Sequence, residues 1–178
     1  MLTAAVICLV VSIADGDTLT ARCETKDVQA AVFAPAQSSS MSLAILASRE
    51  RVMRDDAPYR QIRVRLSGID APEKRQDYGQ QARQALSNLC FRQMAVITPH
   101  SQDRYGRLIA DVQCKQQDAG SYMVRQGLAM VYERYTNTEQ RKRLLPLQEA
   151  ARRERLGQWR MLEQGQEPVA PWQWRRKR

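Results

Sequence analysis

The 178-residue sequence contains a single histidine, His100. That scarcity argues against a Ser-His-Asp triad, a zinc site with two histidines and RNA cleavage by a histidine pair, because each of these depends on imidazole groups. His100 itself follows Pro99 in an expected turn, so we assign it no role. Any catalysis in this chain would therefore use carboxylates, arginines and a hard metal ion.

Long apolar runs are also absent, since no stretch approaches the roughly 20 residues of a membrane span. The N-terminal segment MLTAAVICLVV has neither a basic leading region nor a cleavage site, so it lacks the features of a signal peptide. We still expect a secreted or periplasmic protein, because the cysteine pattern favours an oxidising compartment. A signal peptide that is not part of this sequence would account for that location.

Four cysteines are present, and none has the short CxxC spacing of a zinc or redox site. Cys8 and Cys23 lie equally far from the Asp15–Gly16 turn, so an antiparallel hairpin centred there would place them opposite each other. This favours the disulfides Cys8–Cys23 and Cys90–Cys114. The alternative, four buried free thiols, stays open at this point.

The composition favours one folded domain with a polyanionic partner. Apolar residues make up 43% of the chain, which is enough for a core, and the net charge is +9 with a pI of about 9.8. We treat residues 1–178 as one domain with a long inserted loop at about 24–58 and a basic tail at about 161–178. The tail is expected to be mobile, although Trp172 and Trp174 could pack on the body.

The stretch Gln61–Glu73 is the centre of the sequence argument. Its aliphatic residues alternate with Arg63 and Arg65, the pattern of a half-buried strand. An acidic turn follows, in which Asp70 and Glu73 are separated by Ala71 and the rigid Pro72. Arginines beside carboxylates at a strand end would suit a site for both a cation and a phosphate. A surface cluster of salt bridges is the alternative interpretation of this stretch alone.

The remaining chain alternates between strand and helix signals. The apolar run Val6–Ile13 and the strongly alternating Leu108–Cys114 are the clearest strands, with shorter ones expected at Leu19–Cys23 and Met94–Thr98. Helical patterns cover Gln80–Cys90, Tyr122–Gln126 and about Leu144–Trp159. We expect Ser121 to cap the second helix, Pro146 to start or kink the third, and Trp159 to be a packing anchor.

Five short motifs occur in an order and at spacings that are highly specific together. They are Asp15-Gly16-Asp17-Thr18; Arg65 with Gly68-Ile69-Asp70-Ala71-Pro72-Glu73; Tyr105-Gly106-Arg107; Val124-Arg125-Gln126-Gly127-Leu128-Ala129; and Gly157 with Trp159. On these motifs the chain resembles the staphylococcal-nuclease (thermonuclease) family across nearly its whole length. The segment 24–58 departs from the family pattern, because it is longer than the usual connection there.

The resemblance implies an α+β fold, a five-stranded OB-fold barrel with about three helices. It also implies a Ca²⁺-dependent endonuclease that hydrolyses DNA and RNA with little sequence preference and leaves 3′-phosphate and 5′-hydroxyl ends. On this basis DNA and RNA are the expected partners, and the chain is expected to be a monomer. The alternative is a non-catalytic OB-fold module that binds nucleic acid.

Four residues are assigned to the metal side of the site by the resemblance. Asp17, Asp70 and the carbonyl of Ala71 match the Ca²⁺ ligands, and Asp15 would support them from behind. Calcium binds several oxygen ligands in flexible geometry, which two aspartates, a carbonyl and water could supply.

Four further residues are assigned to the phosphate side by the same resemblance. Glu73 matches the general base proposed to act on the attacking water, with orienting that water or holding the arginines as its alternative roles. Arg65 and Arg107 match the pair that grips the scissile phosphate, and Tyr105 would line the nucleotide pocket. Arginine suits the grip because its planar fork meets two phosphate oxygens and stays charged.

Overall fold

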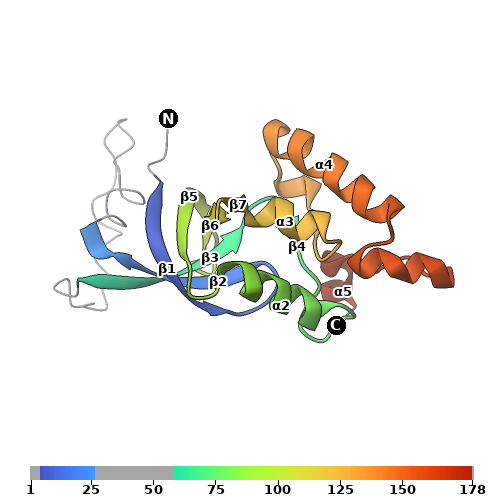
Figure 1. The fold of residues 1–178 in the computed structure, drawn as a ribbon, viewed down its shortest axis with the longest axis horizontal. Helices are drawn as coiled ribbons and strands as arrows, with labels where there is room; N and C mark the ends of the chain where they lie inside the picture. The colour runs from blue at the N-terminus through green and yellow to red at the C-terminus, as the bar shows by residue number, and fades with distance from the viewer. Residues whose placement is uncertain (1–4, 27–57, 178) are drawn as a thin grey trace.

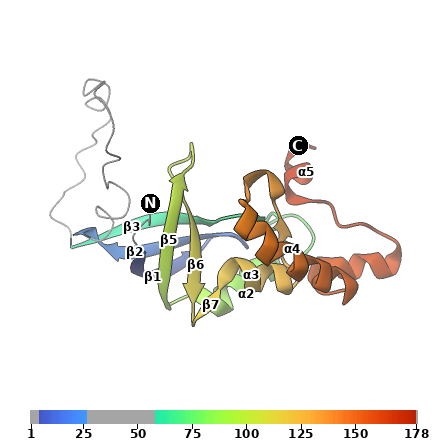
Figure 2. The same ribbon diagram turned by 90° about the horizontal axis from the view of Figure 1, so that it is seen from above.

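The fold is a closed barrel of strands with helices gathered beyond one end of it (Figures 1 and 2). The computed structural model describes residues 5–26 and 58–177. The barrel strands lie in the order β3-β2-β1-β5-β6, and a parallel pairing of β3 with β6 closes the barrel. These strands are β1 (Val6–Ile13), β2 (Thr18–Glu24), β3 (Tyr59–Leu66), β5 (Met94–Gln102) and β6 (Leu108–Cys114). The predicted α+β fold with an OB-type barrel is confirmed.

The β1–β2 hairpin forms where the sequence predicts it. The strands are antiparallel, with Leu9 opposite Arg22, and the chain reverses through the turn that contains Asp15. This register brings Cys8 next to Cys23, and the two are joined by a disulfide with a Cα–Cα distance of 4.5 Å. The predicted pairing is therefore confirmed.

Strand β3 has the alternating pattern predicted for it. Val64 and Leu66 are buried in the core, whereas Arg63 is exposed. After β3 the chain turns into the short strand β4 (Ile69–Asp70), which pairs with β8 (Met130–Val131), and β7 (Gln117–Asp118) extends the edge of β6. Most of the insertion predicted at 24–58 lies outside the described residues.

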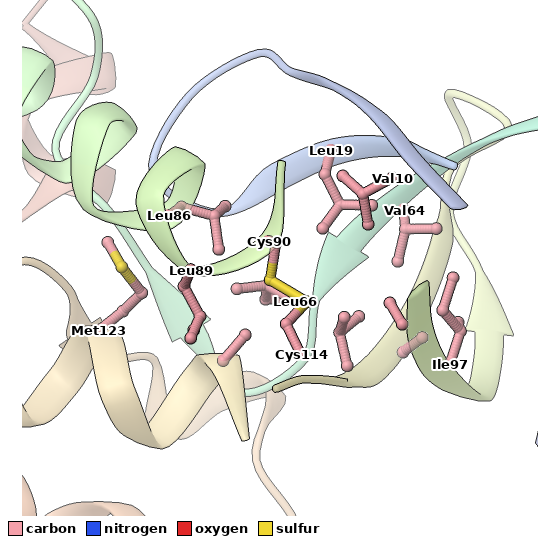
Figure 3. Close-up of a cluster of buried hydrophobic side chains, with 14 of the residues drawn as sticks. Val10, Leu19, Val64, Leu66, Leu86, Leu89, Cys90, Ile97, Cys114 and Met123 are labelled. Carbon is pink, nitrogen blue, oxygen red and sulfur yellow. A yellow bond between two sulfur atoms is a disulfide. The ribbon is translucent and has the colours of Figure 1, made fainter. Parts of the chain in front are cut away.

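Helix α2 (Gly79–Cys90) covers one opening of the barrel and matches the predicted helix closely. Leu86 and Leu89 point into the buried cluster formed with the barrel strands, and the disulfide Cys90–Cys114 fastens the end of the helix to β6 (Figure 3). This second disulfide was also predicted. The described cysteines are all paired, so the free-thiol alternative is wrong in this structure.

Helix α3 (Ala119–Arg125) begins earlier than the sequence analysis expected, and its cap is a different residue. The side chain of Asp118 accepts a hydrogen bond from the Ser121 backbone amide at 2.7 Å, so Asp118 is the N-cap. The prediction of Ser121 as the cap was wrong because an aspartate three residues earlier satisfies that amide.

Helix α4 (Thr138–Arg153) also differs from the prediction of about Leu144–Trp159. It starts six residues sooner because Asn137 and Gln140 form a reciprocal capping box at its N-terminus. Pro146 lies inside the helix rather than at its start. The helix continues through the proline, although proline removes one backbone hydrogen bond there, and it buries Leu144 and Ala151.

The chain after α4 continues in the 3₁₀ helix η3 (Gly157–Gln164), which holds Trp159 with 4% of its surface exposed. Trp159 is thus a packing residue, as predicted. Gly157 has a φ of +52°, and a Cβ there would lie 2.3 Å from the carbonyl oxygen of Gly127. The close approach of these two backbones explains why glycine occurs at both positions of the motif.

Within the described residues of the basic tail, 161–177, the chain forms a helix and Trp172 packs on the body, which the sequence analysis allowed for. Helix α5 (Pro171–Arg176) returns to lie beside β4 and the loop that follows it (Figure 1). Trp172 stacks on Tyr132, with ring centroids 4.8 Å apart, next to the 3₁₀ helix η2 (Glu133–Tyr135). No helix among the described residues is long and apolar enough to cross a membrane.

Candidate active site

Asp17, Arg65 and Asp70 form a compact cluster at one edge of the barrel. Arg65 Nη1 lies 3.2 Å from Asp17 Oδ2, and Arg65 Nη2 lies 2.6 Å from Asp70 Oδ1. One guanidinium therefore bridges two aspartates that are 53 positions apart in the sequence. Each aspartate therefore directs one carboxylate oxygen at the same guanidinium.

The barrel register explains why these residues meet. Thr18 of β2 is opposite Arg65 of β3, and the Leu66 amide donates to the Asp17 carbonyl at 2.8 Å. Asp17 therefore enters the site from the hairpin turn, directly beside the strand that carries Arg65. Asp70 follows at the end of β4, after the turn that leaves β3.

Asp17 is also held from the acidic loop. Its Oδ2 accepts a hydrogen bond from the Ala71 backbone amide at 2.9 Å, and its Oδ1 accepts one from Thr18 Oγ1 at the same distance. These contacts place the backbone of Ala71 beside the Asp17 carboxylate. The structure therefore brings the carboxylates of Asp17 and Asp70 together with the backbone amide of Ala71.

Burial makes this cluster electrostatically unusual. Asp70 is 0% exposed, and this burial raises the pKa of its carboxyl. The hydrogen bond from Arg175 lowers that pKa, whereas the nearby charge of Asp17 raises it further. Burial, with the nearby charge of Asp17, likewise raises the pKa of Asp15 to about 7. Asp15 Oδ1 accepts a hydrogen bond from the Asp17 amide at 3.1 Å and so supports the turn that carries Asp17. The site thus holds more negative charge than its surroundings favour.

Glu73 lies in the loop between β4 and α2, at the edge of the cluster. The Glu73 backbone amide donates a hydrogen bond to Gln76 Oε1 at 3.2 Å. The loop also folds back so that a Cβ on Gly79 would lie 1.9 Å from the Glu73 carbonyl oxygen. Only glycine permits that close approach. The loop is therefore tightly folded around Glu73.

Arg175 of α5 is the residue of the site that the sequence analysis missed. Its Nη2 lies 2.6 Å from Asp70 Oδ2, and its Nη1 lies 2.7 Å from Glu73 Oε1. Its signal in the sequence was only a basic tail that follows two tryptophans. The packing of α5 places Arg175 in the site, and none of the sequence motifs predicted that packing.

Arg107 and Tyr105 form a separate group at the β5–β6 turn. Arg107 Nε donates to Asp103 Oδ2 at 2.8 Å, and its guanidinium lies over the Tyr105 ring, 5.6 Å from the centroid. Tyr105 is 63% exposed. Within the described residues neither side chain contacts Asp17, Asp70 or Glu73. Arg107 directly precedes β6, the strand that pairs with the strand that carries Arg65.

The donor set fits a hard divalent cation such as Ca²⁺. Asp17 and Asp70 offer only oxygen donors, and they converge on the one guanidinium that they share. The described residues contain no group of three or more histidine, cysteine, aspartate or glutamate side chains that could hold a metal ion. A metal bound here would therefore have to complete its ligand shell with backbone carbonyls and water.

Comparison with known proteins identifies the family. The family model described as "Staphylococcal nuclease homologue" matches residues 63–161, which is more than half of the chain. The chain belongs to the staphylococcal nuclease family. The matched segment includes Arg65, Asp70, Glu73 and Arg107, whereas Asp17 and Arg175 lie outside it.

Curated relatives agree with this assignment. The chain is 40% identical over 126 residues to a "Micrococcal nuclease" of Shigella flexneri, covering 65% of this chain and 68% of the relative. It is 32% identical over 170 residues to an "Uncharacterized endonuclease" of Haemophilus influenzae, covering 96% and 73%. It is 28% identical over 189 residues to a staphylococcal-like nuclease of Arabidopsis thaliana, covering 94% of this chain but only 56% of that relative.

Proposed function

We propose that this protein is a Ca²⁺-dependent endonuclease that hydrolyses phosphodiester bonds of DNA and RNA. The observation that carries the proposal is the bridging of Asp17 and Asp70 by Arg65 at the barrel edge, within a chain of the staphylococcal nuclease family. That arrangement puts carboxylates for a cation and a guanidinium for a phosphate in one place. The non-catalytic alternative would not need this acid and arginine set.

Asp17, Asp70 and the Ala71 carbonyl are the groups that would hold the Ca²⁺ ion. When bound, the ion supplies positive charge to a phosphate oxygen, which stabilises the charge that develops there during hydrolysis. The hydrogen bond from the Ala71 amide to Asp17 keeps this backbone segment against the carboxylate. Asp15 supports the turn that carries Asp17.

The protein's own groups would act on the phosphate and the water. Arg65 and Arg107 donate hydrogen bonds to phosphate oxygens, and Glu73 takes a proton from the attacking water or orients it. Hydrolysis that adds water to phosphorus and breaks its bond to the 5′-oxygen leaves a 3′-phosphate and a 5′-hydroxyl. Tyr105, exposed beside Arg107, would line the nucleotide pocket.

The proposal extends to location and assembly. Two disulfides, Cys8–Cys23 and Cys90–Cys114, favour an oxidising compartment, so we propose a secreted or periplasmic enzyme. We also propose that it works as a monomer.

A digestion assay tests this function. Supercoiled plasmid and single-stranded RNA are incubated with the protein in Ca²⁺, in Mg²⁺ and in chelator, and the ends of the fragments are mapped. The proposal predicts cleavage of both substrates in Ca²⁺, none in chelator, and 3′-phosphate ends. Binding of plasmid without cleavage in Ca²⁺ would support the non-catalytic module instead.

A further inference from the structure

Arg175 occupies the oxygens that a metal ion would need. Its Nη2 donates to Asp70 Oδ2 at 2.6 Å and its Nη1 approaches Asp70 Oδ1 at 3.2 Å, so the guanidinium binds this carboxylate through both nitrogens. Asp70 Oδ1 also accepts from Arg65 at 2.6 Å. Both oxygens of the buried carboxylate are therefore already bound to arginine.

The charges of the cluster explain why Arg175 binds there. Asp17, Asp70 and Glu73 are three acidic groups, and Arg65 supplies only one positive charge to them from within the barrel. Arg175 supplies a second charge and contacts Asp70 and Glu73 together. A divalent cation would also neutralise this negative charge, so Arg175 and the metal ion are alternative positive groups for the same carboxylates.

Helix α5, which carries Arg175, is attached to the body by a few contacts. Trp172 stacks on Tyr132 and packs against a small buried cluster that contains Trp159, and Gln76 Nε2 donates to the Val169 carbonyl at 2.5 Å just before the helix. The helix has six residues, and the Arg175 side chain is 42% exposed. It also lies beyond residues 63–161, the part of the chain that matches the family model. Such an element can leave the site without disturbing the barrel.

We propose that α5 is an intramolecular inhibitor in which Arg175 competes with the catalytic metal ion for Asp70 and at the same time pairs with Glu73. The inference rests on the proposed function, because it concerns regulation of the same site. With Arg175 in place, Ca²⁺ binds only after the guanidinium leaves both oxygens of Asp70. Release of α5, by a partner or by removal of the tail, therefore raises the apparent affinity for Ca²⁺.

Calcium titration by isothermal calorimetry on the full chain tests the competition without measuring cleavage. The variants are Arg175→Gln and Arg176→Gln, each of which removes one positive charge from the same helix. Arg176 is exposed and has no ion pair with Asp70 or Glu73 in the described structure, so its variant controls for net charge. Arg175→Lys adds a version that keeps the charge but loses the fork.

The proposal predicts that Arg175→Gln binds Ca²⁺ at least tenfold more tightly than the wild type, that Arg175→Lys is intermediate, and that Arg176→Gln changes the affinity less than twofold. Equal affinities for Arg175→Gln and Arg176→Gln would overturn the competition while leaving the metal site intact. Absence of Ca²⁺ binding in every variant would instead overturn the metal site itself, and the competition with it.

Discussion

Two helices border the acidic loop that carries Glu73, and they are attached in different ways. Helix α2 continues from that loop, buries Leu86 and Leu89 in the core, and is fastened to β6 by the disulfide Cys90–Cys114. Helix α5 reaches the loop from the opposite end of the chain, and only Pro171 of its residues is buried. The contacts that hold it include the Arg175 ion pairs, the stacking of Trp172 and the packing of Trp172 against a small buried cluster.

This difference in attachment distinguishes site residues that are fixed by the barrel from Arg175, which can leave with α5. The positions of Asp17, Arg65 and Asp70 follow from barrel pairing and core packing, so they persist while the fold persists. Arg175 depends on a six-residue helix whose contacts are partly exposed. We therefore expect substitutions on the barrel side to change activity, metal binding and stability, and substitutions on the α5 side to change metal affinity while the fold persists.

Asp70→Asn should have the largest effect, because Asp70 is where the two regions meet. The change removes a charged metal ligand and the partner of both arginines, so we expect cleavage to fall by about 100-fold or more, roughly 3 kcal/mol in transition-state stabilisation. Plasmid cleavage rates in saturating Ca²⁺ measure it. Turnover within threefold of wild type would remove Asp70 from the site.

Replacement of the α2 disulfide should have the next largest effect, and it should be on stability. Cys90→Ser with Cys114→Ser opens a loop with a sequence separation of 24 residues, for which we expect a loss of about 2–4 kcal/mol in the free energy of unfolding. Urea denaturation followed by circular dichroism gives the value. An unchanged unfolding free energy would show that core packing alone holds α2.

Arg107→Lys tests an arginine at the β5–β6 turn, which contacts neither α2 nor α5 in the described structure. Lysine keeps the charge but cannot reproduce the planar fork, so we expect a loss of about 2 kcal/mol, measured as a lower kcat with an unchanged unfolding free energy. Asp103→Asn is the matched control, because it removes the partner of Arg107 and leaves the guanidinium in place. Full activity of Arg107→Lys would exclude a bidentate grip on phosphate at this position.

Trp172→Ala should have the smallest effect, confined to α5. Loss of the stack on Tyr132 weakens the attachment of the helix by about 1 kcal/mol, which corresponds to roughly fivefold faster amide exchange across residues 171–176. Hydrogen exchange followed by mass spectrometry measures it, with Gln173→Ala, an exposed position of the same helix, as control. Faster exchange in α2 as well would contradict the separation of the two regions.

Local patterns and motifs predicted most of the barrel side from the sequence. The alternation in β3 placed Val64 and Leu66 in the core, and the symmetric spacing about the turn paired Cys8 with Cys23. The motifs brought Asp17 and Asp70 together, since the order of strands in a resembling fold fixes which loops meet. These features depend on residues that are close in sequence or joined by a known topology.

The missed features depend on tertiary contacts or on competition between local signals. The position of Arg175 comes from the stacking of Trp172 on Tyr132, a contact across the chain that no local pattern encodes. The start of α4 was placed too late because Pro146 was treated as a boundary, whereas the capping box of Asn137 and Gln140 decides it.

The central claim, that Asp17 and Asp70 together form a metal site, is tested most directly by Ca²⁺ titration calorimetry of Asp17→Asn. The control is Asp77→Asn, which removes an exposed acid between β4 and α2. We predict one Ca²⁺ site in the wild type, an unchanged affinity in Asp77→Asn, and binding at least tenfold weaker in Asp17→Asn. Equal Ca²⁺ affinity in all three proteins would contradict the account.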